Sequence, residues 1–290
     1  MERWTGAFKE IRRRNFDELC AKIRDKVPYD FENSDEQIRD FLEETWALEK
    51  TANAVYSFPG KEAEYIRCFL TAYSKFEHVL DCSRSLFERG SLTWALVDAY
   101  HASIIGARAI LAALGICIFT IGRRTVVVDM FPEFGTVDQR RKFGKEHKGV
   151  DGPVRVMAPS RDQVLDQGNI WNLVRRLVSL KSFASNEEEG LQLAMVDLLD
   201  TKPWSDRHEV MYDLSAWRWR GDIGLSPLSS TDLETLLAAT DQEVIELSQF
   251  VDQIFLLCRF YAEKALGFTI DGKIVLPPRA ADASAPTVLS

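Results

Sequence analysis

The chain has 290 residues, of which 46% are hydrophobic and 28% are charged, so it can bury the core of one large domain or two small ones. Its five cysteines are scattered and contain no C-x-x-C pair, which excludes a zinc knuckle and a disulfide framework and favours a reducing cytoplasm. The charged, amphipathic N-terminal segment does not resemble a signal peptide.

The formal net charge of −8 is spread unevenly along the chain. Residues 1–100 contain 15 Lys and Arg against 19 Asp and Glu, residues 101–181 contain 13 against 7, and residues 182–290 contain 8 against 18. The three parts therefore carry −4, +6 and −10. Such a chain is not a general nucleic-acid binder. Its middle third predicts either a basic face or a segment that neutralises the acidic last third, within one chain or across a dimer.

Residues 1–90 predict an N-terminal helical region. Apolar residues recur at helical spacing over Trp4–Val27. A capping-box pattern at 34–37, in which Ser is followed three residues later by Gln, opens a second helix that ends before the break at Pro59-Gly60. Helical spacing then continues over Glu62–Arg89.

A fourth helix is predicted over Leu92–Leu114. The stretch from Ser103 to Ile121 is nearly long and apolar enough to cross a bilayer. It contains Arg108, however, which would cost about 2.5 kcal/mol or more at the membrane centre, and Gly115 interrupts it. The pattern favours a buried helix that runs into a strand, and no membrane span.

The hydrophobic period changes after this helix. Ile116–Thr120 and Thr125–Val128, joined by a turn at 122–124, predict a β-hairpin, and Val154–Met157 predicts a short third strand. Residues 133–152 are polar, basic and glycine-containing, which is typical of a loop.

Helical spacing returns in the last third of the chain, over residues 162–180, 187–199, 206–217 and 233–266. Residues 268–290 predict a disordered tail, because most of them are alanine, proline, serine and other small or polar residues. The sequence therefore predicts a mainly α fold, a helical bundle with a small β-hairpin insertion.

One segment carries residues suited to chemistry on RNA. Metal-free RNA cleavage needs a base for the 2′-OH proton and a cation for the charged phosphorus centre. Arg207 would supply the cation, and His208 or Tyr212 would handle the proton. On a helix, however, neighbouring side chains point about 100° apart, and a phenol with a pKa of about 10 is a poor base. The alternative is that Arg207 pairs with adjacent carboxylates on a solvated face.

Metal chemistry is not predicted. The string from His208 to Tyr212 reads H-E-x-x-Y, and the tyrosine stands where a zinc-protease helix needs its second histidine. Asp129 with the run Glu146-His147-Lys148 contains the groups of a metal-dependent nuclease, but the polar surroundings of Glu146 favour a solvated loop. The four histidines are dispersed, so neither a metal nor a cofactor is expected.

Basic residues of the loop are candidate RNA contacts, because cations that neutralise phosphates provide most of the affinity for nucleic acid. They are Arg140, Arg141, Lys142, Lys145 and Lys148. The string W-R-W-R at 217–220 would stack bases and bind phosphates, or, in the alternative, end a helix whose tryptophans pack on the core.

Two segments together resemble HEPN domains. Ala99–Ser103 through Arg108–Gly115 is similar to the first core helix of that family, with an aromatic pair followed by an Ala/Arg/Leu-rich run that ends in glycine. Arg207–Tyr212 lies where the family has its R-x4-6-H motif, on a later helix. The resemblance implies a HEPN-like bundle over 91–267, with an insertion at 116–158. It also implies a homodimer in a bacterial toxin or anti-phage defence system. The active members of the HEPN family are metal-independent endoribonucleases.

The motif departs from the family pattern at two positions. His208 replaces the polar residue that usually follows the arginine, and Tyr212 replaces the motif histidine. Some HEPN domains are non-catalytic and serve as binding or dimerisation modules. We therefore expect a cytoplasmic, non-catalytic module that dimerises or binds RNA, a protein partner or an inhibitor. The alternative is a metal-independent endoribonuclease that uses Arg207 with His208 or Tyr212.

Overall fold

The computed structural model describes residues 34–46, 54–89, 91–121, 124–132, 145, 148–157, 167–179, 189–194, 249–263, 269–270, 273–276 and 287–288. Most of these residues are helical, which confirms the prediction of a mainly α protein.

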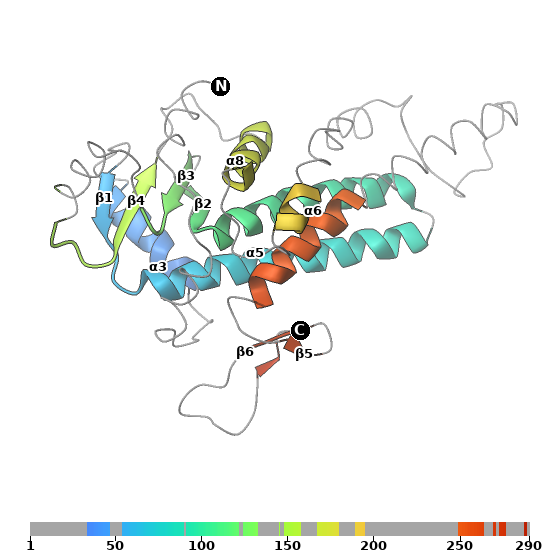
Figure 1. Cartoon of the computed structure of the whole chain (residues 1–290), viewed down its shortest axis with the longest axis horizontal. Helices are drawn as coiled ribbons and strands as arrows, with labels where there is room; N and C mark the ends of the chain where they lie inside the picture. Colours follow the sequence, from blue (N-terminus) through green and yellow to red (C-terminus); the bar gives the residue numbers. More distant parts are fainter. Residues whose placement is uncertain are drawn as a thin grey trace, which may run out of the picture.

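Two long antiparallel helices, α5 (Lys61–Glu88) and α6 (Leu92–Ala113), form the axis of the described fold (Figure 1). Each predicted bound of these helices lies within one residue of the observed bound. On α5, aromatic and aliphatic residues three or four positions apart are buried, among them Phe69, Tyr73 and Phe76. Long helices of this kind are stabilised mainly by such tertiary packing.

The apolar stretch of α6 is a core helix. Trp94–Ala113 is long and apolar enough to cross a membrane by length and composition, but 72% of it is buried inside the fold. This burial agrees with the prediction of a buried helix that runs into a strand.

A four-stranded antiparallel sheet, in the order β1-β4-β3-β2, lies at the end of the helix pair where α5 begins and α6 ends (Figure 1). The predicted hairpin is present as β2 (Ile116–Ile121) and β3 (Arg124–Asp129), and the predicted third strand is β4 (Pro153–Met157). The sequence therefore located three of the four strands, but the sheet is larger than a hairpin insertion.

The fourth strand, β1 (Ala54–Ser57), corrects the prediction of a helix that continues to Pro59-Gly60. The predicted start of this region is confirmed, since α3 covers Ser34–Phe41 and continues as η1 over Leu42–Trp46. The partner of β1 is β4, about a hundred residues away, so nothing local in the sequence signals the pairing. A Cβ on Gly152 would overlap the carbonyl oxygen of Phe58 beside this pair, so the residue must be glycine.

Buried ionic residues tie the start of α5 to the sheet. Lys61 donates to the carbonyl oxygen of Pro153 at 2.8 Å, and its ammonium lies over the Phe131 ring. Arg67 pairs with Glu64 at 2.8 Å within the helix. Buried charges persist in this way only when they are paired or hydrogen-bonded.

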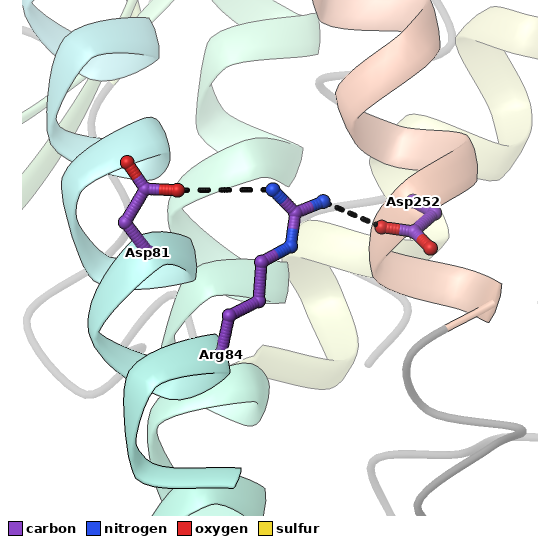
Figure 2. Close-up of polar contacts among 3 residues, drawn as sticks. All are labelled: Asp81, Arg84 and Asp252. Atoms are coloured by element: carbon purple, nitrogen blue, oxygen red, sulfur yellow. Dashed lines mark hydrogen bonds and ion pairs between the residues drawn. The ribbon is translucent and has the colours of Figure 1, made fainter. Parts of the chain in front are cut away.

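Three more helical segments pack around the pair: α8 (Gln167–Ser179), residues 189–194 and residues 249–263, the last of which crosses α5 and α6 (Figure 1). At this crossing the Cys258 thiol donates to the carbonyl oxygen of Gly106. Exposed ion pairs also join these elements. Arg84 of α5 pairs with Asp252 of the segment 249–263 at 3.0 Å and with Asp81 of α5 at 3.7 Å (Figure 2).

Near the C-terminus, β5 (Thr269–Ile270) pairs with β6 (Lys273–Leu276), which also pairs with β7 (Thr287–Val288). These short strands lie within residues 268–290, for which the sequence predicts a disordered tail. Among the described residues they pair with one another and not with the four-stranded sheet.

Candidate functional site

A groove of about 270 Å³ lies where α5 and α6 meet β2 and α3. We call it the basic groove. Its lining residues are Arg39, Cys68, Thr71, Ala72, Lys75, Ile105, Arg108, Ala112, Cys117, Ile118, Phe119 and Thr120.

Helical spacing brings one wall of the groove together from α5. Cys68, Thr71, Ala72 and Lys75 stand at positions i, i+3, i+4 and i+7, so they share one face of the helix. Thr71 and Lys75 are exposed on this face, and Cys68 and Ala72 are partly buried beneath them.

The facing wall comes from α6, where Ile105, Arg108 and Ala112 are also spaced by whole turns. Because β2 follows α6 directly, its residues 117–120 line the groove at the end of this helix. Arg39, in the last turn of α3, adds a side chain from a third helix to the lining of the groove. The groove thus combines apolar side chains with exposed cations.

The charge of the groove is unbalanced. Arg39, Lys75 and Arg108 are all exposed at its surface, and no aspartate or glutamate lines it among the residues that the structure describes. Burial lowers the pKa of the Arg108 guanidinium from its ordinary value, because neighbouring atoms displace water from the charged group. A partly desolvated cation without a carboxylate beside it favours an anionic ligand.

A second cavity, of about 190 Å³, has a different character. It is lined by Arg84, Glu88 and Asp252 together with apolar residues of α5, α6 and the segment 249–263. Its arginine is held between two carboxylates, as Figure 2 shows. Because these charges already compensate one another, this cavity has no comparable excess of positive charge.

Titratable groups with shifted pKa values also occur outside the groove. Burial raises the pKa of Glu77, and the thiol of Cys258 also has a raised pKa because it is fully buried. A buried neutral thiol that donates to a carbonyl oxygen is a structural group. Within the described ranges, no group of three or more His, Cys, Asp or Glu side chains is placed to hold a metal ion.

Most of the predicted site residues lie outside the described residues: Arg207, His208, Tyr212, Arg140, Arg141 and Lys142. Lys145 and Lys148 are described, and both are exposed, but neither lines the basic groove. Their proposed contacts with RNA therefore remain predictions.

Sequence reasoning identified only one of the three groove cations as unusual. Arg108 stood out as the charge in an otherwise apolar stretch, whereas Arg39 and Lys75 belong to ordinary amphipathic helices. The signal that the sequence offered was the helical spacing of Cys68, Thr71 and Lys75, which places small or polar residues on one line of α5.

Comparison with protein-family models, with curated proteins and with solved structures gives no match for this chain. The resemblance to HEPN domains therefore remains a prediction, and a function has to be argued from the groove itself.

Proposed function

We propose that this protein is a non-catalytic binding module whose basic groove holds a phosphate-bearing ligand, a short segment of RNA or a nucleotide. The observation that carries the proposal is the meeting of Arg39, Lys75 and Arg108 at one groove without a carboxylate among its described lining residues.

The chemistry of the lining suits a phosphate. Arginine binds phosphate oxygens through two parallel N–H donors, and lysine adds a compact charge. The exposed hydroxyls of Thr71 and Thr120 are further donors at the same surface. Lipid-like anions would need a longer apolar channel than about 270 Å³ provides.

The net charge of −8 limits the length of the ligand. An acidic molecule repels a long polyanion except where cations are concentrated, so a ligand that lies mainly within the groove is favoured over an extended strand. This agrees with the sequence-based inference that the chain is not a general nucleic-acid binder.

The groove favours binding over catalysis. General acid–base chemistry needs a histidine, a carboxylate or a similar group within hydrogen-bond reach of the substrate. The described lining offers arginine, lysine, threonine and cysteine side chains, with no histidine or carboxylate. We therefore favour a module that binds RNA over one that cleaves it.

The broader setting is also part of the proposal. Residues 91–267 would form a HEPN-like helical bundle that dimerises in the cytoplasm of a bacterial defence or toxin-type system. Support comes from the similarity of Ala99–Gly115 to a HEPN core helix and from the burial of that helix. The metal-independent endoribonuclease that uses Arg207 remains the second candidate, on the strength of its sequence motif.

The test is binding of a fluorescent, 5′-phosphorylated RNA pentanucleotide, measured by polarisation. We expect the triple variant Arg39→Gln, Lys75→Gln, Arg108→Gln to bind more than about tenfold more weakly than the wild type, because each charged hydrogen bond to phosphate contributes about 1.5–3 kcal/mol. The dependence of affinity on salt should also become shallower.

An equal-charge variant distinguishes the groove from exposed cations elsewhere. Arg89→Gln, Lys145→Gln, Lys148→Gln removes three exposed cations that do not line the groove. If this variant loses binding and the groove variant retains it, the groove is not the site.

A further inference from the structure

We infer that the basic groove recognises a terminal phosphate monoester, the phosphorylated end of an RNA strand or of a mononucleotide, in preference to the diesters inside a strand. The inference rests on the proposed function and names the chemical group that the same groove selects.

Positive charge is concentrated at the groove. Arg39, Lys75 and Arg108 come from three different helices and line one small groove. A phosphodiester carries one negative charge, whereas a monoester carries about −1.5 to −2 at pH 7 and has three strong acceptor oxygens. Three cations around one groove therefore match a monoester better than a single diester.

The environment of Arg108 strengthens this preference. Neighbouring atoms partly desolvate its guanidinium and lower its pKa, although the residue as a whole is exposed. Electrostatic attraction grows as the local dielectric falls, so the extra charge of a monoester gains more here than it would on an open surface.

The size of the groove also favours a terminal nucleotide. Its volume of about 270 Å³ lies just below the usual range of ligand sites in proteins, about 300–1,000 Å³. Such a space holds roughly one nucleotide. The groove also meets the sheet where α6 passes into β2, with Cys117–Thr120 as part of its lining.

Apolar side chains also line the groove: Ile105 and Ala112 of α6 and Ile118 of β2. Inorganic phosphate would leave this surface uncovered, whereas the ribose or base of a terminal nucleotide would cover it. A nucleotide should therefore bind more tightly than phosphate alone.

The experiment compares four probes in one competition assay with the full chain: a 5′-phosphorylated RNA pentanucleotide, the same strand with a 5′-hydroxyl, adenosine monophosphate and inorganic phosphate. We expect the phosphorylated strand to bind at least tenfold more tightly than the hydroxyl strand and inorganic phosphate to compete poorly. At pH 5, where the monoester carries about one charge, the preference should shrink.

Two variants test the role of the groove. Arg108→Gln should reduce the preference for the phosphorylated end, and Arg89→Gln, which removes an exposed cation outside the groove, should leave it unchanged. Thermal unfolding of each variant checks that it remains folded. If the monophosphate competes as well as the strand, the recognised unit is the nucleotide; if the strand competes better, it is the strand end. Both results support the inference.

Two other results would overturn it. Equal binding of the phosphorylated and hydroxyl strands, with loss of both in the triple groove variant, would exclude recognition of the terminal phosphate and leave the proposed function standing. Absence of binding for every probe would overturn the proposed function and this inference together.

Discussion

At the scale of single residues, the groove contains a thiol that can report whether a ligand is present. Cys68 lies on the same face of α5 as Thr71 and Lys75, and Cys82 lies fourteen residues further along the same helix, outside the groove. Both thiols are partly exposed. A ligand in the groove should therefore shield Cys68 and leave Cys82 accessible.

This pair of cysteines gives an internally controlled prediction. We expect a saturating phosphorylated pentanucleotide to slow alkylation of Cys68 by iodoacetamide severalfold, while the rate at Cys82 stays constant. Peptide mapping by mass spectrometry measures the two rates in one sample. Equal protection of both thiols would indicate a general stabilisation of the fold, and protection of neither would place the ligand elsewhere.

At the scale of elements, the crossing of α6 and the segment 249–263 depends on the absence of a side chain at Gly106. A Cβ at this position would overlap Ile254 Cγ2 and press on the Phe76 ring, and both of these side chains are fully buried. The close approach also lets the Cys258 thiol reach the carbonyl oxygen of Gly106. A glycine inside a helix costs about 1 kcal/mol relative to alanine, so the packing must compensate for it.

Gly106→Ala should lower the free energy of unfolding by roughly 1–2 kcal/mol, because overpacking a core costs about 1–3 kcal/mol and exceeds the gain in helix propensity. Gly190 is the matched control, since it is also helical but a Cβ there would meet nothing within 4 Å. Gly190→Ala should leave stability unchanged or raise it by up to about 1 kcal/mol. Urea unfolding measures both variants, and equal effects would show that the crossing is not tightly packed.

The elements also show what the sequence can and cannot predict. The bounds of α5 and α6 and the strands β2 to β4 follow from local periodicity and glycine breaks, so they were predictable. The strand β1 could not be predicted in this way, because it forms by pairing with β4, which lies about a hundred residues away in the sequence. The basic groove was missed for the same reason: its cations at 39, 75 and 108 meet only after α3, α5 and α6 have packed.

At the scale of the whole molecule, the distribution of charge bears on whether the protein cleaves RNA or binds the end of an RNA strand. The chain carries a net charge of −8, yet its described surface gathers three cations at one groove. An endoribonuclease would need to hold an internal phosphodiester against a base, whereas a terminal-phosphate binder needs only the strand end. The cations of the groove would meet the second requirement under our proposal, and Arg207 with His208 or Tyr212, outside the described ranges, would meet the first.

We therefore expect the full chain to bind a phosphorylated RNA strand and leave it intact. In EDTA, which inactivates metal-dependent contaminating nucleases, wild type and Arg207→Ala should produce no more cleavage than the triple groove variant. The products are separated on a denaturing gel. His208→Ala and Tyr212→Phe should behave in the same way. Cleavage by the wild type that disappears in Arg207→Ala would establish the endoribonuclease instead, because loss of the proposed phosphorane-stabilising cation should lower the rate by orders of magnitude. The two companion variants would then identify the base, and the groove would be the anchor that positions the substrate.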